Sequence, residues 1–147
     1  MCYTIEINLT REQLEKRFGS RFKNRDDFNP KKRLSAFSQP EIPVITSEAI
    51  DEIQLSNWGL IPFWTKSEED ARSIRTKTAN AVSETIDQKP SYRSLFKKKH
   101  CLVLVNGFYE WQHRDKFKQP YFIRLDNDRP FALAGLYDNW LNKVAHC

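Results

Sequence analysis

The sequence predicts an α+β fold with a curved, mostly antiparallel, barrel-like β core and a few peripheral short helices. Segments with the patterning of short strands dominate the 147 residues, and helical patterns are few and irregularly spaced. Neither an internal repeat nor a regular strand–helix–strand alternation is visible, which argues against a parallel α/β architecture. A (β/α)₈ barrel needs roughly 250 residues, so the length corresponds to one domain, residues 1–147.

The first two elements have clear local signals. Residues 3–9 alternate apolar and polar side chains, which is the period of a half-buried strand. Thr10 and Gln13 have the spacing of a capping box, and an apolar pair four residues apart follows them. Gly19 then ends the predicted helix.

Loops and short elements fill the middle of the chain. Residues 20–39 are polar, basic and interrupted by Asn and Pro, so we expect a long loop with one helical turn. Residues 42–46 and 53–59 are predicted strands separated by an acidic turn. Ser67 precedes three acids, which is typical of a helix N-terminus because the acids complement the helix dipole.

Strands return in the last third of the chain. Short helices are predicted at residues 80–86 and 91–98, before five consecutive apolar residues, 101–105, that predict a strand buried on both faces. A polar loop is expected at residues 112–119. Two further predicted strands are separated by an Asp-Asn-Asp turn: residues 121–125 and 131–137.

Composition limits the classes of function. With 39% hydrophobic and 13% aromatic residues the chain is not disordered, and its apolar runs are too short to span a bilayer. No secretory signal is visible, and three cysteines without a CxxC pair favour a reducing, cytoplasmic location without a metal site. We expect no cofactor and no membrane partner. The net charge of +5 weakly favours a polyanion as partner.

Cys2 is the most informative candidate residue. Initiator methionine is normally removed ahead of a small second residue, which would leave Cys2 at the mature N-terminus. An N-terminal cysteine carries an α-amine with an ordinary pKa of about 8 beside a thiol with one of about 8.5, so both nucleophiles are usable near neutral pH. Such an aminothiol condenses with an aldehyde to a thiazolidine ring. The alternative is that a cysteine stands at position 2 by chance.

Glu110 and Asn80 are the other two catalytic candidates. Glu110 follows the predicted buried strand between Tyr109 and Trp111, and apolar neighbours disfavour a charged carboxylate, which suits proton transfer. Asn80 would supply a neutral hydrogen-bond donor and acceptor. Alternatively, Glu110 points into water and Asn80 only caps a turn.

Two further features suit single-stranded DNA. The aromatic cluster formed by Trp58, Phe63 and Trp64 could stack on bases, with Pro62 and Phe63 as an apolar wedge, although aromatic residues at this density also build cores. From Lys89 to His100 there are five cations and no acid, and we take three of them as phosphate contacts: Arg93, Lys97 and Lys98. The alternative is a solvated charged face.

Together, these positions resemble the SOS-response-associated peptidase (SRAP) domain family. The ordered motifs run along almost the whole chain. They are Met1-Cys2, the segment 58–64 against WG-x-x-P-x-W, residues 80–85 against N-A-R-x-E-T, residues 107–111 against G-F/W-Y/F-E-W, Gln119–Ile123, and Ala134–Tyr137.

The resemblance implies a DNA-damage-response protein that senses abasic sites in single-stranded DNA. In that family the N-terminal cysteine traps the ring-opened deoxyribose aldehyde as a thiazolidine, a covalent crosslink that shields the lesion. Carried over, Cys2 is the nucleophile, Asn80 holds the deoxyribose oxygen or the cysteine amine, and Glu110 moves protons. The resemblance also implies self-removal of the residues ahead of the cysteine, and a cytoplasmic protein that associates with the nucleoid during DNA damage.

The chain departs from the family pattern at three places. Tyr3-Thr4 stands where the family has Gly-Arg, and Val82 stands where it has Arg, so two cationic contacts are missing. The later I-H-x-R-M-P motif is absent, and His146 does not take over its histidine. The chain therefore corresponds to the N-terminal two thirds of the family's usual length. A core without its last strands would expose edges and apolar surface, which favours self-association or low stability.

Two other functions remain open on the sequence. One is a thiol peptidase that acts on other proteins, although no oxyanion donor or peptide pocket is recognisable. The other is a non-catalytic single-stranded-DNA-binding fragment. The sequence does not determine the oligomeric state.

Overall fold

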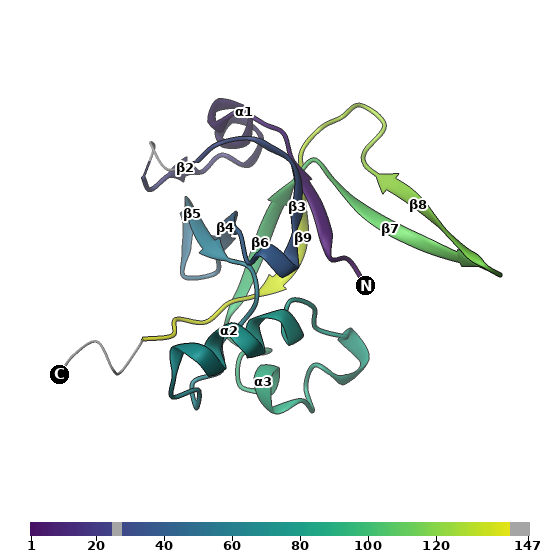
Figure 1. Cartoon of the computed structure of the whole chain (residues 1–147). Coiled ribbons are helices and arrows are strands. Elements are labelled where there is room, and N and C mark those ends of the chain that lie inside the picture. The colour runs from purple at the N-terminus through teal and green to yellow at the C-terminus, as the bar shows by residue number, and fades with distance from the viewer. Residues whose placement is uncertain (25–27, 142–147) are drawn as a thin grey trace.

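The computed structural model describes residues 1–24 and 28–141 and forms two β-sheets with helices at their periphery (Figure 1). The helical elements of this part of the chain are α1 (Arg11–Phe18), η1 (Ala36–Ser38), α2 (Glu68–Lys77), η2 (Ser83–Thr85) and α3 (Pro90–Arg93). Its strands are β1 (Thr4–Ile7), β2 (Arg21–Phe22), β3 (Lys31–Ser35), β4 (Glu41–Thr46), β5 (Ala49–Asn57), β6 (His100–Val105), β7 (Gly107–Arg114), β8 (Phe117–Ile123) and β9 (Phe131–Leu136).

One sheet has the order β3-β1-β7-β8, and the other has the order β2-β5-β4-β6-β9. All neighbouring strands are antiparallel except β2 and β5. The predicted α+β class with a mostly antiparallel core is therefore confirmed, and the sheets do not close into a barrel. Helices α2 and α3 lie together at one end of the molecule (Figure 1).

The alternating pattern at the N-terminus does form a strand. In β1 the side chains of Ile5 and Ile7 are 0% and 1% exposed and belong to the main apolar cluster. The predicted capping box starts α1, since the Thr10 side chain accepts from the Gln13 backbone while the Gln13 side chain accepts from the Thr10 backbone. Gly19 ends the helix with a φ of 69°, a left-handed conformation that glycine adopts without strain.

The predicted loop over residues 20–39 was wrong in part: this segment contributes strand β2 and the edge strand β3, whereas the one helical turn expected in it is present as η1. The residues of β3 were read as loop because three consecutive cations, 31–33, are exposed and only Leu34 is buried. An edge strand pairs on one side only and needs few core contacts, so it carries no hydrophobic alternation. Strand β2 has two residues, too few to show a period.

Two predictions in the last third also need correction. Strand β6 is buried on both faces only at its end, where Leu104 and Val105 are fully buried on opposite faces, because Leu102 is 44% exposed. The expected loop at residues 112–119 is instead the end of a hairpin in which β7 and β8 pair from Phe108↔Ile123 to Arg114↔Phe117. This hairpin end projects away from the body, so polar residues occupy both of its faces (Figure 1).

Most other predicted elements are present with shifted ends. Strands β4, β5 and β9 confirm the predictions at residues 42–46, 53–59 and 131–137, although β5 starts at Ala49. Ser67 caps α2 by accepting a hydrogen bond from the backbone of Asp70, as its acidic first turn predicted. The two short helices expected after residue 80 are reduced to single turns, η2 and α3.

Cys101 should make the protein less stable in alkali. It is 7% exposed in β6, and burial raises the pKa of its thiol from 9.0 to about 11. As the pH rises through this window, the unfolded thiol releases its proton while the folded one keeps it, so stability falls. The loss reaches about 3 kcal/mol once the pH exceeds the folded-state pKa.

Urea unfolding at pH 7 and pH 10.5 checks this expectation. Cys101→Ala should show a smaller drop in the free energy of unfolding between the two pH values than the wild-type protein. An equal drop in both proteins would contradict the assignment of this pH dependence to Cys101.

Candidate active site

The N-terminus and Glu110 lie together where β1 pairs with β7. The register Thr4↔Tyr109 brings the residues before β1 beside the middle of β7. The Met1 ammonium is 3.4 Å from Glu110 Oε1, and the Glu110 side chain is 33% exposed. Glu110 does not follow the buried strand directly, as the sequence suggested, because the chain turns at Asn106 and Glu110 belongs to the next strand.

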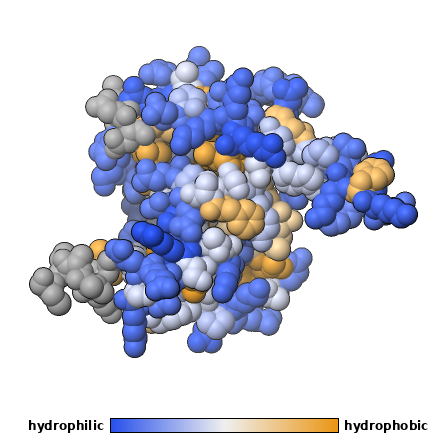
Figure 2. Space-filling model, in the orientation of Figure 1, coloured by the Kyte–Doolittle hydropathy of each residue, from blue (hydrophilic) through white to orange (hydrophobic). Residues whose placement is uncertain are grey.

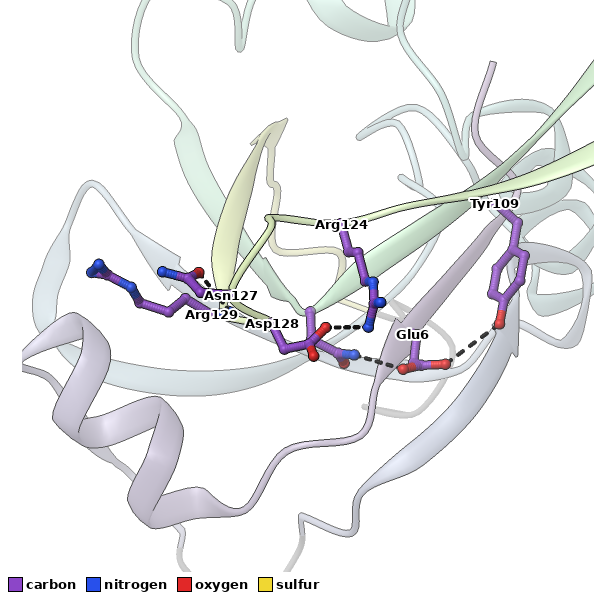
Figure 3. Close-up of polar contacts among 7 residues, drawn as sticks. Glu6, Tyr109, Arg124, Asn127, Asp128 and Arg129 are labelled. Atoms are coloured by element: carbon purple, nitrogen blue, oxygen red, sulfur yellow. Dashed lines mark hydrogen bonds and ion pairs between the residues drawn. The ribbon is translucent and has the colours of Figure 1, made fainter.

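A clamp on the other face of these two strands fixes this register. Glu6 accepts hydrogen bonds from the Asn106 amide at 2.6 Å and from the Tyr109 hydroxyl at 3.4 Å (Figure 3). The Arg33 guanidinium lies over the Tyr109 ring, 5.2 Å from its centre, and adds β3 to the same contacts. The clamp joins residues about a hundred positions apart and thereby determines where Glu110 lies relative to the N-terminus.

Cys2 lies between the core and the carboxylate. Its side chain is half-buried against the main apolar cluster, and its thiol hydrogen-bonds the Thr4 carbonyl at 3.3 Å. Burial raises the pKa of the thiol above its ordinary value, and the Glu110 carboxylate raises it further. Hydrogen bonding to the backbone of Thr4 and Tyr109 and the charge of the terminal amine act in the opposite direction. A thiol with this pKa is largely protonated at neutral pH.

Asn80 is held at the end of α2 by its neighbours. The Tyr92 hydroxyl donates to the Asn80 carbonyl at 3.0 Å, and the Trp58 indole donates to the Ala79 carbonyl at 2.9 Å. The Asn80 amide nitrogen is buried and has no hydrogen-bond partner. Burial raises the pKa of Tyr92, and the Tyr3 phenol raises it further. Asn80 thus has an unused hydrogen-bond donor in the loop that Tyr92 and Trp58 hold.

The aromatic cluster divides into buried and exposed members. Trp58 packs against the main apolar cluster, and Pro62 is fully buried, so Pro62 supports its loop from inside and has no free surface for a nucleotide. Phe63 and Trp64 are 68% and 42% exposed and meet edge to face with their ring centres 5.1 Å apart. The exposed pair is the part of the cluster that is available for stacking.

The cationic segment is largely solvent-exposed. Arg93 lies at the end of α3, and Lys97 and Lys98 lie in the following turns, all three on the surface. Lys99 is instead engaged, since its ammonium is 2.6 Å from a carboxylate oxygen of Glu48.

Neither metal ligands nor membrane helices were found among residues 1–24 and 28–141. This part of the chain has no group of three or more His, Cys, Asp or Glu side chains able to hold a metal ion. None of its helices is long and apolar enough to cross a membrane. His146 and Cys147 lie outside the described residues.

Sequence reasoning gave no role to three residues that shape the site. Arg75 donates to the carbonyls of Gln39 and Trp58 at 3.2 and 3.3 Å, and Tyr92 holds Asn80. Gly59 has a φ of 103° and lies against the backbone of Arg75. Gly59 belongs to the WG motif, which was the only sequence signal for any of them.

Comparisons with known proteins assign the chain to a family. The family model described as SOS response associated peptidase (SRAP) matches residues 1–146. The chain belongs to the SRAP family. The prediction of this family from the ordered motifs is therefore confirmed.

Two abasic site processing proteins resemble the chain in sequence. It is 38% identical to the abasic site processing protein YoqW of Bacillus subtilis over 104 residues, 70% of this chain and 45% of the relative. It is 41% identical to the abasic site processing protein HMCES of Gallus gallus over 102 residues, 56% of this chain and 30% of the relative. The chain therefore matches less than half the length of either relative.

A crystal structure of a protein from Bacteroides thetaiotaomicron is similar with a TM-score of 0.88 and 38% identity, over 98% of this chain and 63% of that one. A second, from Bordetella bronchiseptica, has a TM-score of 0.79 at 23% identity over 97% of this chain and 66% of that one, which supports the fold alone. The fold described here is thus shared with solved proteins over nearly the whole chain.

Proposed function

We propose that this protein captures abasic sites in single-stranded DNA as a covalent thiazolidine at Cys2. The observation that carries the proposal is the 3.4 Å ion pair between the Met1 amine and Glu110, which brings the start of the chain close to this carboxylate, while the same carboxylate raises the pKa of the Cys2 thiol. The relatives named as abasic site processing proteins support the same target. Such a protein acts in the cytoplasm, at the nucleoid while DNA is damaged.

The reaction needs the amine of Cys2, so Met1 must first be removed. The amine adds to the aldehyde carbon of the ring-opened sugar, and loss of one water gives an imine. The thiol sulfur then adds to the imine carbon while the thiol proton goes to the nitrogen, which closes the five-membered ring. No electrons are gained or lost, and no cofactor is required.

Two side chains assist these steps. Glu110 accepts the proton that the attacking ammonium must lose and returns a proton to the departing hydroxyl group, which is general base and general acid catalysis by one carboxylate. The unpartnered Asn80 amide nitrogen donates a hydrogen bond to the deoxyribose oxygen, or the Asn80 side-chain oxygen, turned inward, accepts one from the amine. The raised pKa of Cys2 keeps the thiol protonated, so the carboxylate also removes this proton.

The DNA strand is held by stacking and by charge. Phe63 and Trp64 stack on bases beside the lesion, and Arg93, Lys97 and Lys98 contact phosphates. In the SRAP family the peptidase in the name corresponds to self-removal of residues before the cysteine, which here would release the Cys2 amine.

Denaturing electrophoresis tests the proposal directly. Single-stranded DNA carrying one uracil is treated with uracil-DNA glycosylase and mixed with the protein. A heat-stable shifted band should form with the wild-type chain and with Cys101→Ala, and Cys2→Ala should give none. Cys101 is the matched control because it is the other described cysteine, buried and with a pKa of about 11. A stable band with folded Cys2→Ala, or none with the folded wild type, would refute the proposal.

A further inference from the structure

The end of the β7–β8 hairpin is a separate projection, which we call the arm and define as residues 112–119. Figure 2 shows it extending from the body with a mainly hydrophilic surface and a hydrophobic patch near its end. Phe117 is 61% exposed and Tyr121, at the base of the arm, is 44% exposed. An isolated two-stranded hairpin buries too little surface to be stable by itself. The projecting arm therefore adds little to the stability of the fold.

One face of the hairpin is continuous with the candidate active site. Side chains alternate along a strand, so those at 108, 110, 112 and 114 of β7 share a face with those of their partners in β8. At the body this face is the core side, because Phe108 packs against the main apolar cluster. Glu110, paired with Tyr121, is the position where the face leaves the core and becomes exposed.

A polar network organises this face beyond Glu110. The Gln112 side-chain oxygen accepts from Arg114 Nε at 3.0 Å and from the Tyr121 hydroxyl at 3.3 Å, and the Arg114 guanidinium also donates to that hydroxyl at 3.2 Å. No carboxylate in the described part of the chain forms an ion pair with Arg114. Its positive charge is therefore fixed in place but not neutralised.

The charge and the aromatic rings of the arm suit a nucleic acid. Residues 112–119 contain three cations, Arg114, Lys116 and Lys118, against one acid, Asp115. Exposed rings that alternate with cations are typical of surfaces that bind single strands by stacking and phosphate contacts. Arg114 is four residues from Glu110, or about 13 Å along the strand, which is a distance of a few nucleotides.

We propose that this face of the arm binds the DNA strand that flanks the abasic site, with Tyr121 stacking on a base and Arg114 contacting a phosphate. The inference rests on the proposed function, since that function places the lesion at Glu110. Pairing of two copies of the chain through the edge of β8 is less favoured, because Pro120 in the middle of β8 lacks an N–H.

Equilibrium binding tests the arm without any covalent step. The probe is a labelled single-stranded 15-mer with a central tetrahydrofuran residue, which lacks an aldehyde and cannot be crosslinked, and the readout is fluorescence anisotropy at several salt concentrations. Tyr121→Ala should weaken binding roughly tenfold, and Tyr121→Phe should bind within about twofold of the wild type because the ring remains. Arg114→Ala should also weaken binding and reduce the slope of log affinity against log salt by about 0.7.

Lys118→Ala is the matched control. It removes one charge from the same arm, but Lys118 pairs with His113 on the opposite face, so we expect less than about a twofold effect. Unchanged binding in Tyr121→Ala and Arg114→Ala, or an equal loss in Lys118→Ala, would overturn the proposal. The proposal would also be overturned if analytical ultracentrifugation showed a wild-type dimer that Tyr121→Ala converts to a monomer.

The same variants separate this inference from the proposed function. With reactive abasic DNA, Lys118→Ala should reach its half-maximal crosslinking rate at the wild-type DNA concentration, whereas Arg114→Ala should need a higher one, because the arm contributes to binding. If the wild type forms no crosslink but the arm variants still weaken binding, the proposed chemistry fails and the arm assignment stands.

Discussion

Glu110→Gln should slow formation of the thiazolidine crosslink roughly 100-fold, within the range that a positioned general acid or base contributes. Glutamine has nearly the same shape but cannot accept the proton from the amine or from the thiol. The wild-type carboxylate also raises the pKa of Cys2, so the substitution should lower that pKa and increase the thiolate population at neutral pH. Reactivity toward a simple alkylating agent and reactivity toward the abasic site should therefore change in opposite directions.

Two measurements on the same variant check this expectation. Alkylation of Cys2 by iodoacetamide as a function of pH should move to lower pH in Glu110→Gln, and the single-turnover crosslinking rate should fall. Glu12→Gln, on the exposed surface of α1, is the matched control and should change neither quantity. If Glu110→Gln crosslinks as fast as the wild type or faster, the carboxylate acts only as a charge and does not transfer protons.

Gly59→Ala should destabilise the protein by about 3 kcal/mol. Gly59 has a φ of 103°, which side-chain-bearing residues rarely adopt, and its new Cβ would lie 2.5 Å from the carbonyl oxygen of Arg75. A strained backbone and an overpacked contact each cost about 1–3 kcal/mol, and here the contact is with the backbone of α2, which cannot rotate away. Trp58 and the Asn80 loop should shift together, since the Trp58 indole is bonded to Ala79.

Chemical denaturation of Gly59→Ala beside Gly19→Ala measures this effect. Gly19 also has a positive φ, 69°, but an added Cβ there meets no atom within 4 Å, so only the cost of the backbone conformation remains, about 1 kcal/mol. Equal destabilisation of the two variants would show that the contact with α2 is unimportant.

Local signals predicted the elements that bury one face. The alternation around Ile5, the capping box at Thr10 and the acids after Ser67 each depend on neighbours within a few residues, and each is present in the structure. The edge strand β3 and the end of the β7–β8 hairpin were read as loops for one common reason. Neither packs two faces against the core, so neither needs a hydrophobic period.

Only part of the candidate site could be predicted from the sequence. Cys2 was recognisable from its position in the chain, and Glu110 and Asn80 from ordered motifs. The contacts that bring Glu110 to the N-terminus were not, because Glu6 is separated by a hundred residues from Asn106 and by 103 from Tyr109. Tyr92 was missed for a different reason, since its hydroxyl donates to a backbone carbonyl, a contact that leaves no sequence pattern.

Mass spectrometry of the product of the protein with single-stranded abasic DNA tests the central claim most directly. The adduct should have the mass of the chain without Met1 plus that of the oligonucleotide minus one water. After digestion, the nucleotide should be attached to the N-terminal peptide that begins with Cys2, with no free thiol at that residue. An adduct that retains Met1, or one attached to a lysine or to Cys101, would contradict capture by an N-terminal aminothiol.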